Sequence, residues 1–175
     1  MPASPSPSPS VRLFLAVWPD PASRAALADW QRSWRWPPGA ALVPSERLHL
    51  TLHFLGNVPV ARVPQLVAAL RLPFVPFELR FARVQLWPGG LAVVRMQSTP
   101  DELLALHARL AGALRALDLE VDTRPYRAHV TLARKAAGAA PAQPAPEHTW
   151  HASQGYALVR SLPNGAGYEV LERFS

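Results

Sequence analysis

The 175-residue sequence contains no cysteine, which excludes disulfide bonds, thiolate nucleophiles and cysteine-ligated zinc or iron–sulfur sites. It also lacks a long hydrophobic run. The longest apolar stretch near the start, residues 11–18, is too short to span a bilayer, and no Lys or Arg precedes it as in a signal peptide. We therefore expect a cytoplasmic protein without a membrane segment.

Lysine is almost absent, since Lys135 is the only one, and yet the net charge is +6 because 18 basic residues outnumber 12 acidic ones. The arginine guanidinium offers paired hydrogen-bond donors to phosphate oxygens, so an arginine-rich surface suits a polyanionic partner. An excess of Arg over Lys, together with abundant Ala and Pro, is also typical of a GC-rich genome. Charge by itself therefore supports a phosphate-bearing partner only weakly.

Composition predicts one globular domain behind a short tail. Residues 1–10 are mainly Pro, Ala and Ser, and we expect them to be disordered because such a segment cannot form a core. The remaining residues, 11–175, are expected to form a single domain. Hydrophobic residues make up 49% of the chain, which is ample for a buried core.

Strand-like and helix-like patterns alternate in two rounds and predict a pseudo-symmetric α+β protein. Asp20 and Pro21 are typical of a helix start, as N-cap and first helical residue. Thr99 and Glu102 are expected to form a capping box with Pro100 as the first helical residue. The predicted strands are 11–17, 45–55, 77–87, 91–97, 128–133, 152–162 and 168–173, and the predicted helices are 22–34, 60–71 and 100–117.

The most informative feature is a four-residue phrase that occurs twice, at residues 49–52 (HLTL) and 129–132 (HVTL). Residues i and i+2 of a strand point to the same face, so each copy places a histidine beside a threonine. With six His and five Thr in the chain, random placement gives about 0.17 occurrences of His-x-Thr. We interpret the two copies as two halves of one active site.

Two histidines can act as a general acid and a general base at neutral pH, because imidazole titrates at about pH 6.5. Attack on a phosphodiester needs both groups: the base takes a proton from the nucleophile, and the acid gives one to the departing oxygen. This chemistry requires no metal. We therefore predict His49 and His129 as catalytic residues and expect no cofactor.

The phosphate group itself needs hydrogen-bond donors, because negative charge shifts onto its oxygens in the transition state. The hydroxyls of Thr51 and Thr131 can donate to these oxygens. Arg127 and Arg134, which flank the second copy, can add charged donors. We predict all four as phosphate-binding or substrate-binding residues.

A zinc site is a second interpretation of the same residues. In a regular strand His49 and His53 share a face with Thr51, so two imidazoles could bind a metal. Zinc sites need three or four ligands, and no third ligand is evident, so we predict no metal site. His53 is then expected at the rim of the site or in solvent. No catalytic role is expected for His107, His148 and His151.

Longer phrases accompany the two copies, at residues 12–19 (RLFLAVWP), 48–56 (LHLTLHFLG), 124–134 (RPYRAHVTLAR) and 168–174 (YEVLERF). Together they resemble the two-histidine phosphoesterase superfamily, and within it the LigT-like RNA 2′,3′-cyclic phosphodiesterases, also called 2′-5′ RNA ligases. The sequence departs from the family pattern at Ala128, where the family often has Pro, and at His53, where a small or other residue is more usual. Neither departure removes a predicted catalytic group.

The resemblance implies a bilobal fold in which two antiparallel sheets line a central, positively charged cleft, with helices outside. It implies hydrolysis of the terminal 2′,3′-cyclic phosphate of RNA to a 2′-phosphate without metal or nucleotide cofactor, with reversible 2′-5′ ligation as a further activity. It further implies that His49 is the acid on the departing 3′-oxygen and His129 the base toward water. Thr51 and Thr131 would hold the phosphate, with Arg134 as a further contact.

Other functions stay open at this stage. A binding module could recognise RNA ends or a nucleotide in the same cleft without turnover, although binding alone has no need of two titrating groups. The same chemistry could also act on 2′,5′-linked oligonucleotides or on small cyclic nucleotides. We expect a monomer without an obligate protein partner, because no apolar stripe is left unexplained.

Overall fold

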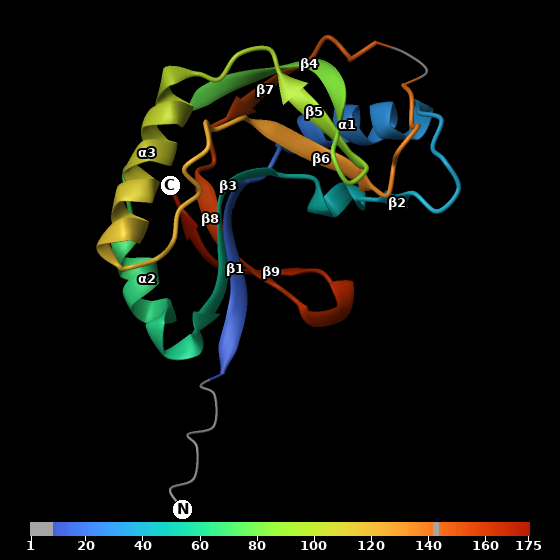
Figure 1. Cartoon of the computed structure of the whole chain (residues 1–175). Helices are drawn as coiled ribbons and strands as arrows, with labels where there is room; N and C mark the ends of the chain where they lie inside the picture. Colours follow the sequence, from blue (N-terminus) through green and yellow to red (C-terminus); the bar gives the residue numbers. More distant parts are fainter. Residues whose placement is uncertain (1–8, 142–143) are drawn as a thin grey trace, which may run out of the picture.

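The computed structural model describes residues 9–141 and 144–175 (Figure 1). Most of the predicted tail, residues 1–8, lies outside the described residues, and Ser10 already belongs to the first strand. The helices and strands are β1 (Ser10–Val17), α1 (Pro21–Ser33), β2 (Ala41–Leu42), β3 (Leu50–Pro59), α2 (Val63–Ala69), β4 (Phe77–Trp87), β5 (Leu91–Met96), α3 (Asp101–Ala116), β6 (His129–Arg134), β7 (Thr149–Ala152), β8 (Tyr156–Ser161) and β9 (Tyr168–Phe174).

The strands form a curled antiparallel sheet in the order β7-β4-β5-β6-β3-β1-β8-β9, with β2 paired to β6. Within the described residues, the halves β7-β4-β5-β6 and β3-β1-β8-β9 are joined by one residue pair, Leu50 of β3 with Val130 of β6. Helices α2 and α3 lie on the outer side of the curl (Figure 1). The predicted α+β class with two antiparallel sheets is confirmed, and the structure adds that the two sheets are continuous.

The main hydrophobic core fills the space between the sheet and the helices. Leu50 and Val130 are both fully buried in it, so the join between the two halves is anchored on the core side. Strand β1 shows the same two-sided arrangement, because Leu13 and Leu15 are fully buried while Phe14 belongs to a small cluster on the opposite face. Among the described residues, no helix is both long and apolar enough to cross a membrane.

Helix α1 begins as predicted, whereas the predicted cap of α3 is wrong. Asp20 is the N-cap of α1, with its carboxylate accepting a hydrogen bond from the backbone N–H of Ser23. At α3 the carbonyl of Pro100 accepts the first helical hydrogen bond, from the N–H of Leu104 at 3.0 Å. Pro100 is therefore the N-cap, Thr99 lies one residue too early, and no side chain among the described residues caps this helix. The helix itself is confirmed, and its apolar side is buried at Leu103, Leu106, Leu110 and Leu114.

Three predicted elements have different bounds in the structure. The predicted strand 45–55 begins with a 3-10 turn, Ser45–Arg47, and continues as β3 from Leu50. Residues 60–71 form a 3-10 turn, Val60–Arg62, before the short helix α2, because Pro64 lacks an N–H and fits only a first helical turn. The predicted strand 152–162 corresponds to β8 on β1, residues 156–161, and the sequence did not reveal β7 on β4, which ends at residue 152. Gly155 lies between them with φ of 82°, and a Cβ there would lie 1.8 Å from the carbonyl oxygen of Phe174. Only glycine fits this point, where the chain passes from one half of the sheet to the other.

Candidate active site

The join between the two halves of the sheet brings the two His-x-Thr copies together. Because Leu50 pairs with Val130 in an antiparallel register, each histidine lies opposite the threonine of the other copy. Leu50 and Val130 point into the core, so their neighbours on both sides point to the opposite face. The two copies are thus related by a local twofold axis, and their four side chains share one surface.

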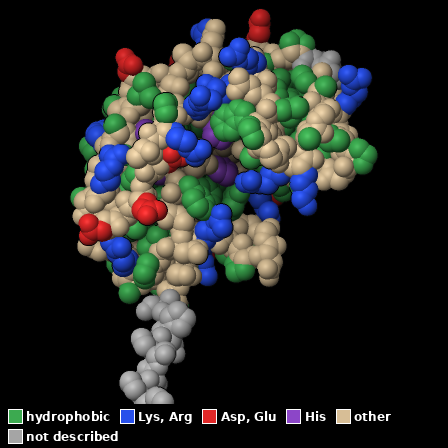
Figure 2. All heavy atoms as spheres, in the orientation of Figure 1, with side chains coloured by type: hydrophobic (Ala, Val, Ile, Leu, Met, Phe, Trp, Pro, Cys, Tyr) green, Lys and Arg blue, Asp and Glu red, His purple; other side chains and the backbone are tan. Residues whose placement is uncertain are grey.

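These four side chains line a pocket of about 160 Å³. Arg134, predicted from the sequence, lines it as well. Among the described residues that line this pocket, none is Asp or Glu. Figure 2 shows histidine side chains inside a hollow with Lys and Arg side chains around it. The pocket therefore suits a small anion. The lining residues that the sequence did not reveal as site residues include Arg12, Phe14, Arg47, Phe54 and Tyr168.

Both histidine rings are held by the same kind of backbone contact. Nδ1 of His49 donates to the carbonyl of Arg47 at 2.7 Å, and Nδ1 of His129 donates to the carbonyl of Arg127 at 2.6 Å. A carbonyl only accepts, so each Nδ1 carries its hydrogen and Nε2 of the neutral ring is the acceptor. Nε2 of His49 lies 3.1 Å from the hydroxyl oxygen of Thr51. Each ring is therefore fixed in the tautomer that exchanges a proton at Nε2.

The arginines around the pocket contribute in different ways. Arg127 is exposed and is not among the residues that line the pocket; its contribution here is the carbonyl that orients His129. Arg47 has two contacts, since its carbonyl orients His49 while its guanidinium donates to two carbonyls of the β8–β9 loop. Arg47 precedes the first copy by two residues, as Arg127 precedes the second, so a comparison of the two copies could have indicated it.

Aromatic rings surround the His49 imidazole. Phe14 and Trp18 stack on it, with ring centroids 5.0 and 5.2 Å away, and Tyr168 meets it edge-on at 5.4 Å. Burial lowers the pKa of His49 below the ordinary value of histidine, and the nearby charge of His129 lowers this pKa further. The ring therefore takes up a proton less readily than a histidine in solution.

The second histidine has a similar environment on the other half of the sheet. The Trp87 ring lies 4.5 Å from the His129 ring, and Arg95 of β5 pairs with His129 in register. Burial lowers the pKa of His129, and the charge of Arg95 lowers it as well. Both histidines of the pocket are therefore biased toward the neutral form in the free protein.

One buried amide holds the strand of the second copy in place. Gln31 of α1 is 5% exposed, and its Nε2 donates to the carbonyl of Leu132 at 2.7 Å and to that of Val43 at 2.9 Å. A buried amide nitrogen with both hydrogens bonded fixes its partners firmly. Nothing in the sequence near residue 31 indicated this role, because its partners lie far along the chain.

The prediction for His53 is wrong, because this side chain is neither at the rim nor in solvent. It is 5% exposed, its Nε2 donates to the carbonyl of His107 at 2.8 Å, and the two rings stack at 3.9 Å. Strand β3 carries a bulge at Leu52, where two residues of β3 oppose one of β1. The extra residue reverses the alternation of faces after Thr51, so His53 points to α3. Among the described residues, no three His, Asp or Glu side chains are grouped so that they could hold a metal ion.

Comparison with known proteins gives a consistent result. Residues 17–96 match the family described as LigT like phosphoesterase. The chain is 34% identical to an RNA 2′,3′-cyclic phosphodiesterase of Thermus thermophilus over 94% of this chain and 90% of that protein. It is 30% identical to one of Escherichia coli over 79% and 80% of the two chains. The crystal structure of E. coli LigT complexed with 3′-AMP matches with a TM-score of 0.83 at 26% identity, over 95% and 98% of the two chains.

Proposed function

Since the chain belongs to the LigT-like phosphoesterases, we propose that it hydrolyses the terminal 2′,3′-cyclic phosphate of RNA to a 2′-phosphate, with His49 and His129 as acid and base. The observation that carries this proposal is the twofold arrangement of the two His-x-Thr copies around one small pocket without acidic lining. The relatives named RNA 2′,3′-cyclic phosphodiesterase support the substrate. The E. coli LigT structure complexed with 3′-AMP supports a nucleotide phosphate as the ligand.

In the proposed reaction the cyclic phosphate lies between the two histidines. His129 accepts a proton at Nε2 from a water molecule, whose oxygen attacks phosphorus. The bond from phosphorus to O3′ breaks, and His49 donates its Nε2 proton to O3′, which leaves a 2′-phosphate and a free 3′-hydroxyl. The hydroxyls of Thr51 and Thr131, with the guanidinium of Arg134, donate to the phosphate oxygens as their charge increases.

The electrostatics of the pair support one acid and one base. Burial and the charge of His129 both disfavour a proton on His49, so a second proton on the pair is less stable than the first. A bound cyclic phosphate brings a negative charge, which favours protonation of a neighbouring ring. The complex with substrate therefore favours one protonated and one neutral histidine, which is the state that the reaction needs.

The proposal includes no metal and no nucleotide cofactor. Both proton transfers use imidazole, and a pocket with arginine rather than carboxylate lining favours an anion over a divalent cation. One copy of the chain supplies both histidines, so a monomer suffices. The same proposal covers 2′-5′ ligation, because a 5′-hydroxyl in place of water would attack the same phosphorus and give a 2′-5′ linkage while O3′ leaves.

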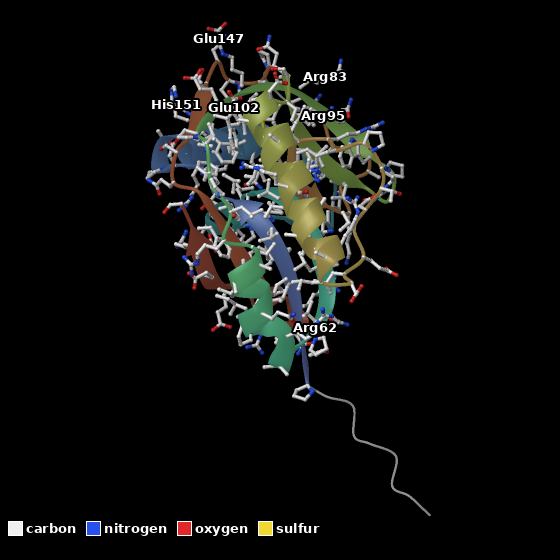
Figure 3. The ribbon with its side chains drawn as sticks, turned by 90° about the vertical axis from the view of Figure 1, so that its left-hand side faces the viewer. Arg62, Arg83, Arg95, Glu102, Glu147 and His151 are labelled. Atoms are coloured by element: carbon white, nitrogen blue, oxygen red, sulfur yellow. The ribbon has the colours of Figure 1, made fainter. Side chains whose placement is uncertain are left out.

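The test is incubation of the purified protein, in EDTA, with a short RNA that ends in a 2′,3′-cyclic phosphate, with separation of 2′-phosphate from 3′-phosphate product. We expect the 2′-phosphate, and a rate lowered about 10²- to 10⁴-fold by His49→Ala and by His129→Ala. His151→Ala is the matched control, because this side chain is 66% exposed and points outward at the edge of the molecule (Figure 3).

Three outcomes would contradict parts of the proposal. Near-normal turnover in either active-site variant would exclude the two-histidine mechanism. Binding of the RNA without any product would favour a recognition module. Activity that is lost in EDTA and restored by zinc or manganese would indicate a metal-dependent reaction.

A further inference from the structure

A second and larger cavity, of about 710 Å³, opens beside the catalytic pocket. It lies between the start of β1, the β2 segment and the loop that joins β8 to β9, and these segments face one another across the concave side of the sheet (Figure 1). Arg12, Arg47, Arg134 and Tyr168 line both cavities. The two cavities therefore form one continuous surface, and a ligand in the small pocket can extend into the large one.

The larger cavity is strongly basic. Arg12, Arg47 and Arg134 are among its lining residues, and among the described residues that line it none is Asp or Glu. Arg12 is exposed and pairs in register with Ser161 of β8 and Asn57 of β3, which also line the cavity, so its side chain lies on the concave face. Its guanidinium lies over the Phe54 ring at 4.7 Å from the ring centre, and among the described residues it has no acidic partner, so its charge can meet a phosphate.

One guanidinium is held in place where the two cavities meet. Arg47 donates from Nη1 to the carbonyl of Gly165 at 3.0 Å and from Nη2 to the carbonyl of Ala166 at 3.2 Å. Gly167 leaves room for it, because a Cβ at this position would lie 3.1 Å from Nη2 of Arg47. A charged donor that is already fixed loses less conformational entropy when it binds an anion.

We propose that this larger cavity, the arginine groove, binds the phosphodiester on the 5′ side of the terminal nucleotide together with the nucleotide before it. This inference rests on the proposed function. Once the cyclic phosphate occupies the catalytic pocket, the next phosphate of an RNA chain is one nucleotide away. The adjoining surface of the larger cavity is lined by arginine side chains. Tyr168, which borders both cavities and is 37% exposed, offers a ring for base stacking. The enzyme therefore prefers oligonucleotides to nucleoside cyclic monophosphates.

The experiment compares kcat/KM for a nucleoside 2′,3′-cyclic monophosphate with kcat/KM for a dinucleotide that carries the same terminal nucleoside and cyclic phosphate. For the wild-type protein we expect the dinucleotide value to be at least about tenfold higher, since one charged hydrogen bond is worth that much or more. Arg12→Gln should bring the ratio close to one, and Arg12→Lys should retain part of it. Arg80→Gln is the matched control, because Arg80 is exposed on β4 and lines neither cavity.

Salt dependence gives a second readout. Each phosphate contact on a single strand adds about 0.7 to the slope of log(kcat/KM) against log salt. The dinucleotide should therefore show a steeper slope than the monophosphate in the wild-type protein, and Arg12→Gln should remove most of the difference.

Equal kcat/KM for the two substrates in the wild-type protein would overturn the proposal that the groove binds the second nucleotide, and it would leave the proposed function intact. An equal loss for both substrates in Arg12→Gln would also overturn it, because the effect would not depend on the second nucleotide. If neither substrate is hydrolysed, the proposed function fails. The groove is then tested by affinity alone, and it is wrong if the dinucleotide binds no more tightly than the monophosphate.

Discussion

The phenolic hydroxyl of Tyr126 donates a hydrogen bond to the backbone carbonyl of Thr51 at 2.9 Å. Tyr126 lies three residues before the second His-x-Thr copy, and Thr51 belongs to the first copy. This hydrogen bond therefore connects the segment before the second copy to strand β3, which carries the first. The Tyr126 ring also stacks on His107 at 4.1 Å. Burial raises the pKa of Tyr126 far above its ordinary range, so the hydroxyl stays a donor at every working pH.

Replacement of Tyr126 by Phe should therefore lower kcat about tenfold with little change in KM, because a small displacement of Thr51 misplaces a donor to the transition state. The free energy of unfolding should fall by about 1 kcal/mol for the lost hydrogen bond. Tyr156→Phe is the control, since the hydroxyl of Tyr156 donates to the carbonyl of Leu70 at 2.7 Å, away from the pocket. An equal fall of kcat in both variants would show that the effect is only a loss of stability.

Thr51→Val and Thr131→Val remove one hydroxyl each from the pocket while keeping a β-branched side chain in the strand. We expect each to lower kcat by about 10- to 100-fold, less than a full oxyanion-hole deletion, because the other hydroxyl and the arginines remain. Thr149→Val on β7 is the control. Steady-state kinetics with a cyclic-phosphate substrate measures the effect, and a rise in KM with unchanged kcat would place the hydroxyls in substrate binding alone.

The pH dependence of kcat/KM follows from the two imidazoles in the free enzyme. Burial lowers the pKa of His49 and of His129, so both values lie below about 6.5. As the pH increases, kcat/KM rises when the base loses its proton and falls when the acid loses its proton. The lowered pKa values therefore shift the rising and the falling side of the profile to lower pH. We expect a bell-shaped profile in EDTA with its maximum on the acid side of pH 6.5. The kcat profile should lie at higher pH, because bound phosphate favours the protonated ring.

The stacked rings of His53 and His107 predict a loss of stability in acid. Burial, with the charge of His53 as a further cause, lowers the pKa of His107 to about 4, against about 6.5 in an unfolded chain. The unfolded state thus binds more protons between these values, and the free energy of unfolding falls as the pH drops from about 6.5 toward 4. Urea unfolding at several pH values measures this fall in the free energy of unfolding.

His107→Phe keeps a ring in the stack without a titrating group, so it should reduce this acid dependence. His151→Phe, at an exposed position, is the control and should leave the dependence unchanged. An identical pH dependence in wild type and His107→Phe would show that other groups determine the acid sensitivity.

Most local structure could be predicted because it depends on short-range periodicity. The start of α1 at Asp20, the apolar stripe of α3 and the β4–β5 hairpin all follow from residues within a few positions of one another. The errors have equally local physical causes. One bulge at Leu52 turns His53 from the cleft to the helix side, and a bulge leaves no clear mark in a run of alternating residues.

The sequence by itself determined that two histidines and two threonines stand on strand faces, because alternation along a strand fixes which side chains share a side. It could not determine that the two copies lie next to each other, since this depends on the pairing of Leu50 with Val130, eighty positions apart. Nor could it reveal that Arg12, Arg47 and Tyr168 belong to one surface. These residues come from three separate segments, and only the curl of the sheet and the β8–β9 loop place them around the same cavity.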